Sequence, residues 1–114
     1  MVNGAVRLMA QGALWRATGW KAAGRPLVAA LGSPDEDIRT LAGILLVRGG
    51  ERAKPLLEEA LRQREHLPMV VSVLASLEDR RYEPSLRMLV QDPDPRVADA
   101  AREGLRVLLD GARR

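Results

Sequence analysis

The stretch RPLVAALGSPDEDIRTLAGILL, residues 25–46, decides the fold because both of its halves recur along the chain. Its proline-led half returns twice, as KPLLEEAL (54–61) and EPSLRMLV (83–90). The three prolines that begin these segments are each 29 residues apart: Pro26, Pro55 and Pro84. A fixed period between about 20 and 50 residues indicates stacked units that bury their apolar faces against their neighbours.

The second half of the stretch repeats as well. IRTLAGILLVRGG (38–50) matches VRLMAQGALWRATG (6–19) without a gap, and apolar residues recur in both at i, i+4 and i+8. This spacing is typical of one face of a helix. Weaker third and fourth copies extend the stripe, which we predict to face the core; it runs through Val6, Ile38, Met69 and Val97.

Residues that begin or end helices agree with this period. Thr18-Gly19 and Gly49-Gly50 are suited to helix ends, and the SPDED (33–37) and DPDP (92–95) turns supply capping oxygens for helix starts. A proline needs no hydrogen-bond donor in a first helical turn, which explains the periodic prolines. We predict seven helices, over residues 4–17, 21–32, 35–48, 52–64, 67–78, 82–91 and 95–110.

The pattern resembles the HEAT repeat, particularly the short bacterial form named after phycocyanobilin lyases. The resemblance rests on residues 25–46 and on EPSLRMLVQDPDPRVADAAREGL (83–105), and it extends over essentially the whole chain. It implies an all-α fold: an α-solenoid with a right-handed superhelix of about three and a half hairpins, in one domain covering residues 1–114. Two departures are Ala98, where the family has an arginine, and the third copy HLPMVV (66–71), which lacks the turn aspartate and the arginine.

Composition limits the kind of core and the classes of function. Apolar residues make up 46% of the 114 residues and aromatic residues only 3%, so Leu, Val, Ala and Ile must build the interior. The absence of cysteine excludes disulfides, thiolate nucleophiles and cysteine-based zinc sites, and fits a reducing cytoplasm. No apolar run approaches the ~18 residues of a membrane span. Residues 1–34 carry four cations and no acid, as a transit peptide can, but they align with later repeats and are read as folded protein.

No set of residues in the sequence indicates catalysis. His66 is the only histidine, with no nucleophile or orienting carboxylate at a triad spacing, and we expect it in a solvent-facing loop. The acids Asp35, Glu36 and Asp37 are explained by helix capping and the helix dipole rather than by a metal. We therefore predict a protein that is not an enzyme and that holds neither cofactor nor metal.

Cations cluster at the predicted loops that follow the first helix of each pair. They could form a basic rim that binds nucleic acid or another polyanion, although cations also stabilise helix C-termini and few aromatic residues accompany them. The rim comprises Arg16, Lys21, Arg25, Arg48, Arg52, Lys54, Arg80 and Arg81.

An apolar outer face is the sequence feature that most favours a function. If the stripe through Val6 faces the core, the opposite side of the first three repeats is apolar, whereas the last helix carries charged residues there. We predict that this convex face binds a protein partner or a second copy in a homodimer; the alternative is that the third helix is internal. The predicted face comprises Leu8, Trp15, Ile44, Val47, Val71 and Leu74.

Two further surfaces complete the interpretation. The predicted helix 95–110 is apolar over too wide an arc for one contact, so we expect it to close the domain against two neighbours. The second helix of each pair would line a concave side of mixed character without a deep apolar pocket. The sequence thus favours a non-enzymatic interaction scaffold; the alternatives are a polyanion binder and, by the resemblance, an accessory subunit or small lyase-like protein.

Overall fold

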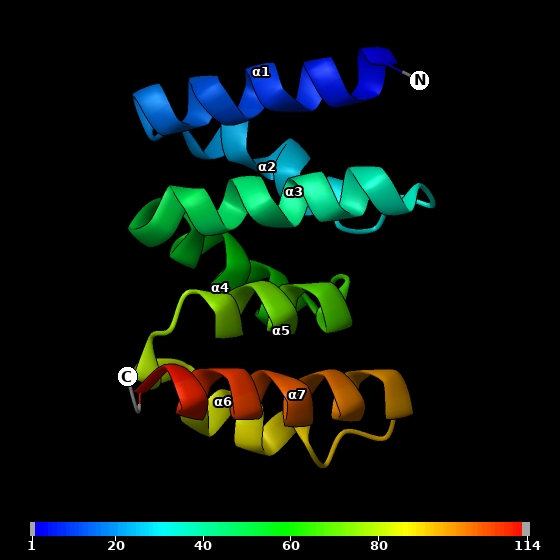
Figure 1. Cartoon of the computed structure of the whole chain (residues 1–114), viewed down its shortest axis with the longest axis vertical. Coiled ribbons are helices and arrows are strands. Elements are labelled where there is room, and N and C mark those ends of the chain that lie inside the picture. The colour runs from blue at the N-terminus through cyan, green and yellow to red at the C-terminus, as the bar shows by residue number, and fades with distance from the viewer. Residues whose placement is uncertain (1, 113–114) are drawn as a thin grey trace. The chain divides into compact units, whose positions relative to one another are not determined.

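The computed structural model describes residues 2–112, and these form helices joined by short turns (Figure 1). The elements are α1 (Val2–Thr18), α2 (Lys21–Ala30), α3 (Glu36–Gly49), the 3-10 helix η1 (Gly50–Arg52), α4 (Ala53–Gln63), α5 (Leu67–Ser76), the 3-10 helix η2 (Arg80–Tyr82), α6 (Glu83–Leu89) and α7 (Pro95–Ala112). The predicted all-α class is confirmed, and the number of helices is close to the seven expected. The solenoid stays a prediction.

Helix ends follow the predicted capping residues. The Asp35 carboxylate accepts a hydrogen bond of 2.9 Å from the backbone N–H of Asp37 at the start of α3, and Asp94 does the same for Arg96 in α7. Gly19 ends α1 with a φ of 69°, a conformation that costs little without a Cβ atom. The first-turn explanation holds for Pro84, but it is wrong for Pro26, which lies inside α2.

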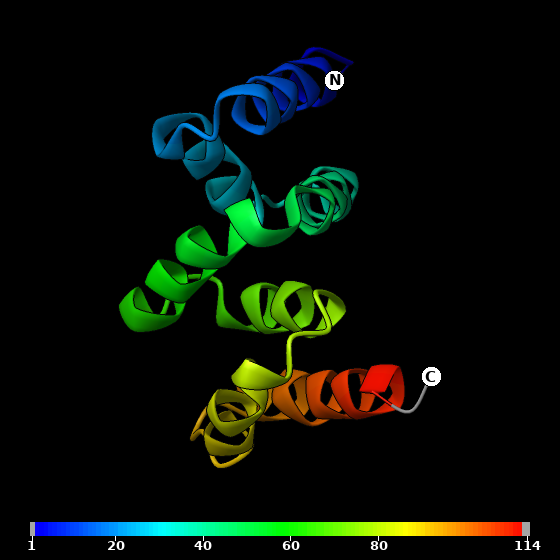
Figure 2. The same ribbon diagram turned by 90° about the vertical axis from the view of Figure 1, so that its left-hand side faces the viewer.

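The chain divides into two compact units, Met1–His66 and Leu67–Arg114. In the first unit α1 packs against α2 and α3, and α2 also packs against α4. Helices α1 and α3 therefore form one layer of this unit, and α2 and α4 form the other (Figure 2). In the second unit α7 packs against both α5 and α6, so its predicted docking against two neighbours is confirmed.

Trp15 is the centre of the core of the first unit. Its side chain is only 1% exposed, and two glycines leave the space that it occupies. A Cβ atom at Gly24, in α2, would lie 2.8 Å from Trp15 Nε1, and one at Gly49, at the end of α3, would overlap the six-membered ring. The indole thus touches the backbones of both helices that flank α1.

The burial of Trp15 reverses the predicted orientation of α1. Leu8, seven residues earlier on the same face, is buried with it, whereas Val6 is 58% exposed instead of facing the core. Helix α1 has apolar residues on two faces, and only one of them can pack inward. The face with the tryptophan packs inward because an indole removes more apolar area from water than a valine or a methionine does.

The second unit has a core of aliphatic side chains. Val97 and Leu108 of α7 and Val71 of α5 are buried, and a Cβ atom at Gly104 would lie 3.3 Å from Val71. The outer side of α7 is charged and internally paired, with an ion pair of 2.7 Å between Arg102 and Asp99. This helix therefore presents an ordinary solvated surface.

None of the described helices is both long and apolar enough to span a bilayer.

The packing of Trp15 yields a test of the fold. The backbone at Gly49 is right-handed helical, with φ −69°, so alanine suits its conformation and only the overlap with the indole opposes it. We expect Gly49→Ala to lower the free energy of unfolding by about 1–3 kcal/mol, as overpacking does. The control is Gly4→Ala on α1, whose Cβ would be 3.7 Å from Ile38, an ordinary contact. Urea unfolding followed by circular dichroism measures both; equal stabilities would contradict this account of the core.

Candidate functional site

The structure places the six residues of the predicted convex face in different environments. Leu8, Trp15, Val71 and Leu74 are between 0% and 5% exposed, so their prediction as an outer face is wrong. The reason is the reversed orientation of α1 and, for the α5 residues, the packing of an almost wholly apolar helix within a core. Ile44 is 45% exposed and Val47 is half-buried, as an outer position allows.

The reversed α1 exposes a different apolar surface, which we name the α1 outer face. Its large side chains are Val6, Met9 and Leu14, which are 58%, 55% and 49% exposed. At 100° per residue, all its members fall within an arc of about 140° opposite Trp15. The α1 outer face comprises Val6, Met9, Ala10, Ala13, Leu14 and Ala17, all exposed.

Charge is confined to the two edges of this face. On the helical wheel Arg7 borders Leu14 on one side and Arg16 borders Met9 on the other, and both arginines are exposed. No residue of α1 is acidic, and LMAQGALW (8–15) has no charge at all. Scattered exposed apolar residues are normal on a protein surface, but from Val6 to Ala17 no charged or polar side chain falls within this arc, which is unusual for a helix at a surface.

The outer side of α7 provides the comparison. Its exposed residues alternate in sign and pair along the helix, as in the contacts of Arg106 with Glu103 and Asp110. The hydrogen bond from Arg106 holds the pKa of the Glu103 carboxyl below its usual range. The outer side of α7 is therefore the charged surface expected of a helix in contact with water, whereas the outer side of α1 is apolar.

The basic rim predicted from the sequence is only partly available. Lys54 is buried and pairs with Glu51. Arg80 is 2.8 Å from Glu83, and Arg81 is 2.6 Å from Asp79. The remaining rim residues are exposed, and none has an ion pair with an acid among the described residues; they all lie in the first unit and are Arg16, Lys21, Arg25, Arg48 and Arg52.

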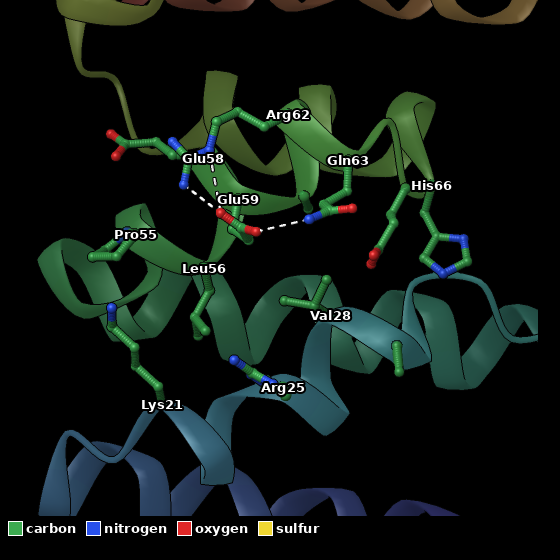
Figure 3. A pocket seen from close by; sticks show the side chains of 13 residues that line it. Lys21, Arg25, Val28, Pro55, Leu56, Glu58, Glu59, Arg62, Gln63 and His66 are labelled. Atoms are coloured by element: carbon green, nitrogen blue, oxygen red, sulfur yellow. Dashed lines mark hydrogen bonds and ion pairs between the residues drawn. The ribbon is translucent and has the colours of Figure 1, made fainter.

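A groove of about 800 Å³ lies between α2 and α4 in the first unit (Figure 3). Lys21 and Arg25 line one wall, and Glu58 and Glu59 line the other. Hydrogen bonds from Gln63 and then Arg62 hold the pKa of the Glu59 carboxyl below its usual range. The groove is mixed in charge, and the Glu59 carboxylate is already bound by Arg62 and Gln63.

His66 also borders this groove. It is exposed, as predicted, and its ring lies so close to Gly32 that a Cβ atom there would overlap it. The described residues contain no group of three or more His, Asp or Glu side chains placed to hold a metal ion. His66 lines the groove together with its neighbour Glu65.

The α1 outer face was missed because the core side of α1 was assigned by alignment with later repeats. Two signals in the sequence could have located it. Trp15 is the bulkiest residue of the segment and should pack inward when small residues face it, and the uncharged run 8–15 is unusual for a helix at a surface. Either signal would have placed Val6 on the outside.

The two tryptophans provide a test of this orientation. Trp15 is 1% exposed, whereas Trp20, just after α1, is 65% exposed. We expect acrylamide to quench the fluorescence of the Trp15→Phe variant, which retains Trp20, several-fold more than that of Trp20→Phe. The Trp20→Phe variant should emit at shorter wavelength because its indole is shielded from water. Equal quenching of the two variants would place Trp15 outside the core and contradict the α1 outer face.

Comparisons with known proteins do not identify the chain. No family model matches it, and neither the search of curated proteins nor that of solved structures returned a match. The resemblance to HEAT repeats therefore stays a prediction, and the candidate site rests on the geometry of α1 alone.

Proposed function

We propose that this protein is a non-enzymatic protein-interaction module whose α1 outer face receives a helix of a partner protein. The single observation that supports this proposal is the exposed arc of six apolar residues on the first helix, bordered by one arginine on each edge. A helix that lies on another helix needs an apolar stripe of about this width.

The length of the face suits a helix better than a compact globular surface. The 12 residues from Val6 to Ala17 extend over about 18 Å at 1.5 Å per residue. A second helix packs about 8–10 Å from the first and interdigitates its side chains with the ridges of α1. Exposed alanines at positions 10, 13 and 17 allow a close approach, while Val6, Met9 and Leu14 project into the gaps between the partner's side chains.

A strip of this size provides only part of a stable interface. About 18 Å by 10 Å gives roughly 180 Å², whereas each side of a standard interface buries about 800 Å². The partner must therefore also contact the surface next to α1. The adjoining residues at the C-terminal end of α1 include the exposed Trp20, an amphipathic side chain of the type that anchors interfaces.

The homodimer predicted from the sequence stays a prediction, but a second copy is not the occupant that we propose. Four of the six residues on which the homodimer rested are buried. A second copy would also bring its own acid-free segment 1–34, with a net charge of +4, against the same charge on the first. The apolar strip alone is too small to offset that repulsion.

Binding by this module is expected to leave the backbone nearly unchanged. The indole of Trp15 ties α1 to α2 and to the end of α3, so the outer face is a preformed surface. Little conformational entropy is then lost on docking, which is the advantage of a rigid packed scaffold.

The proposal is tested with an 18-residue peptide probe that has a Leu/Ala face and uncharged Gln flanks and is cross-linked to hold a helix. We expect it to bind the wild-type protein measurably in fluorescence anisotropy, and Ala13→Glu to weaken binding at least tenfold. A buried unpaired carboxylate is costly, so this change acts on the complex and not on the exposed free helix.

The matched control is Thr40→Glu, an exposed position of α3 with the same change of charge. It should leave the affinity within about twofold of the wild type. Light scattering on the same samples gives the molar mass. Absence of peptide binding, or equal loss in both variants, would contradict the proposal, and a stable dimer that Ala13→Glu dissociates would make a second copy the occupant.

A further inference from the structure

We infer that the partner helix carries acidic residues along the flanks of its apolar face, and most densely where it lies over the C-terminal end of α1. This inference rests on the proposed function, because it names the chemistry of the helix that the α1 outer face receives.

The cations around α1 differ in their pairing from the cations of the second unit. In the second unit Arg80, Arg87, Arg102 and Arg106 each have a carboxylate of the same unit within ion-pair distance. In the first unit the exposed cations on α1 and at the turn that ends it have no ion pair with an acid among the described residues; they are Arg7, Arg16, Lys21 and Arg52. No acid among residues 4–111 therefore pairs with the charge at this surface.

Two of these cations lie at the edges of the face. Arg7 and Arg16 border it on opposite sides of the helical wheel. Both lie at the boundary between apolar strip and solvent, where the e and g residues of coiled coils select partners by charge. A partner helix with acids at its own flanks would form ion pairs on both sides, whereas lysines there would meet like charge.

The cations are also distributed unevenly along the helix. The guanidinium of Arg52 approaches the turn that ends α1, because a Cβ atom at Gly19 would be 3.9 Å from its Nε. Arg16 and Lys21 flank the same turn in the sequence. Three cations thus gather at the C-terminal end, against Arg7 alone near the other end. Acids are favoured in the first turn of a helix by its dipole, so the distribution also favours a partner that runs antiparallel to α1.

The carboxylates of an acidic helix are preferred over nucleic acid as the ligand of these cations. A surface that binds a polyanion requires positive charge and no apolar strip, and a surface on which bases stack requires several aromatic side chains. The surface offers one exposed aromatic side chain, Trp20, beside a wide apolar face. Apolar contact and flanking charge together are what an amphipathic acidic helix provides.

The experiment compares three cross-linked helical peptides with the same Leu/Ala face and with Glu, Gln or Lys at the flanking positions. We expect the Glu peptide to bind at least tenfold more tightly than the Lys peptide in 50 mM NaCl. The Glu peptide forms several exposed ion pairs with the cations, whereas the Lys peptide is repelled by them. In 0.5 M NaCl, screening should reduce the ratio to about twofold or less.

Variants assign the effect to the arginines at the edges. Arg7→Gln with Arg16→Gln should bring the ratio below about threefold while leaving the affinity for the Gln peptide nearly unchanged. Arg102→Gln with Arg106→Gln is the control, because it removes the same charge from arginines that are paired within the second unit. This control should keep the full preference for the Glu peptide.

Each outcome separates the inference from the proposed function. If the Gln peptide binds but the Glu and Lys peptides bind equally well, the acidic partner is overturned and the docking function stands. If none of the three peptides binds, both are overturned. If a 20-nucleotide single-stranded DNA binds more tightly than the Glu peptide and Ala13→Glu does not affect it, the cations serve a polyanion and the inference is overturned.

Discussion

The structure of the first unit depends on one packing constraint, the burial of the Trp15 indole against two glycines. Few aromatic residues are available to this core, and this one lies where α1 meets α2 and the end of α3. Gly24 and Gly49 contribute no side chains, so the helices close around the ring at van der Waals distance. A side chain at either glycine would have to displace the ring or separate the helices, because protein interiors have no spare volume.

The orientation of α1 follows from that constraint, and the character of its outer face follows from the orientation. Leu8 and Trp15 point inward together because they are seven residues apart. Val6, Met9 and Leu14 must then point outward, although they are no less apolar than many core residues. The protein therefore leaves a hydrophobic face in water as a consequence of satisfying its core, and that face is available for a partner.

Much of the fold could be predicted from the sequence, because helix ends are decided locally. The aspartates at positions 35 and 94 cap the helices as expected, and Gly19 ends α1. The rotation of each helix about its axis is decided by tertiary packing instead. In α1 two apolar faces competed, and periodicity alone could not choose between them. In α5 nearly every residue is apolar, so the sequence does not distinguish its outer side from its core side. Val71 and Leu74 were therefore predicted to be exposed although they are buried.

The positions of the cations could be predicted from the sequence, but their ion pairs could not, because ion pairing also depends on tertiary packing. Sequence position placed the cations correctly, but their pairing depends on geometry; Arg81 is bound by Asp79 at 2.6 Å, whereas Arg16 has no such neighbour among the described residues. Paired arginines are largely neutralised, while unpaired ones keep their long-range field and increase the rate of encounter with an acidic molecule. The apolar strip contributes little to that rate, but it slows dissociation, because desolvated contacts must be broken before the partner leaves. A surface with unpaired cations at its edges and an apolar strip between them can therefore bind an acidic partner quickly and release it slowly.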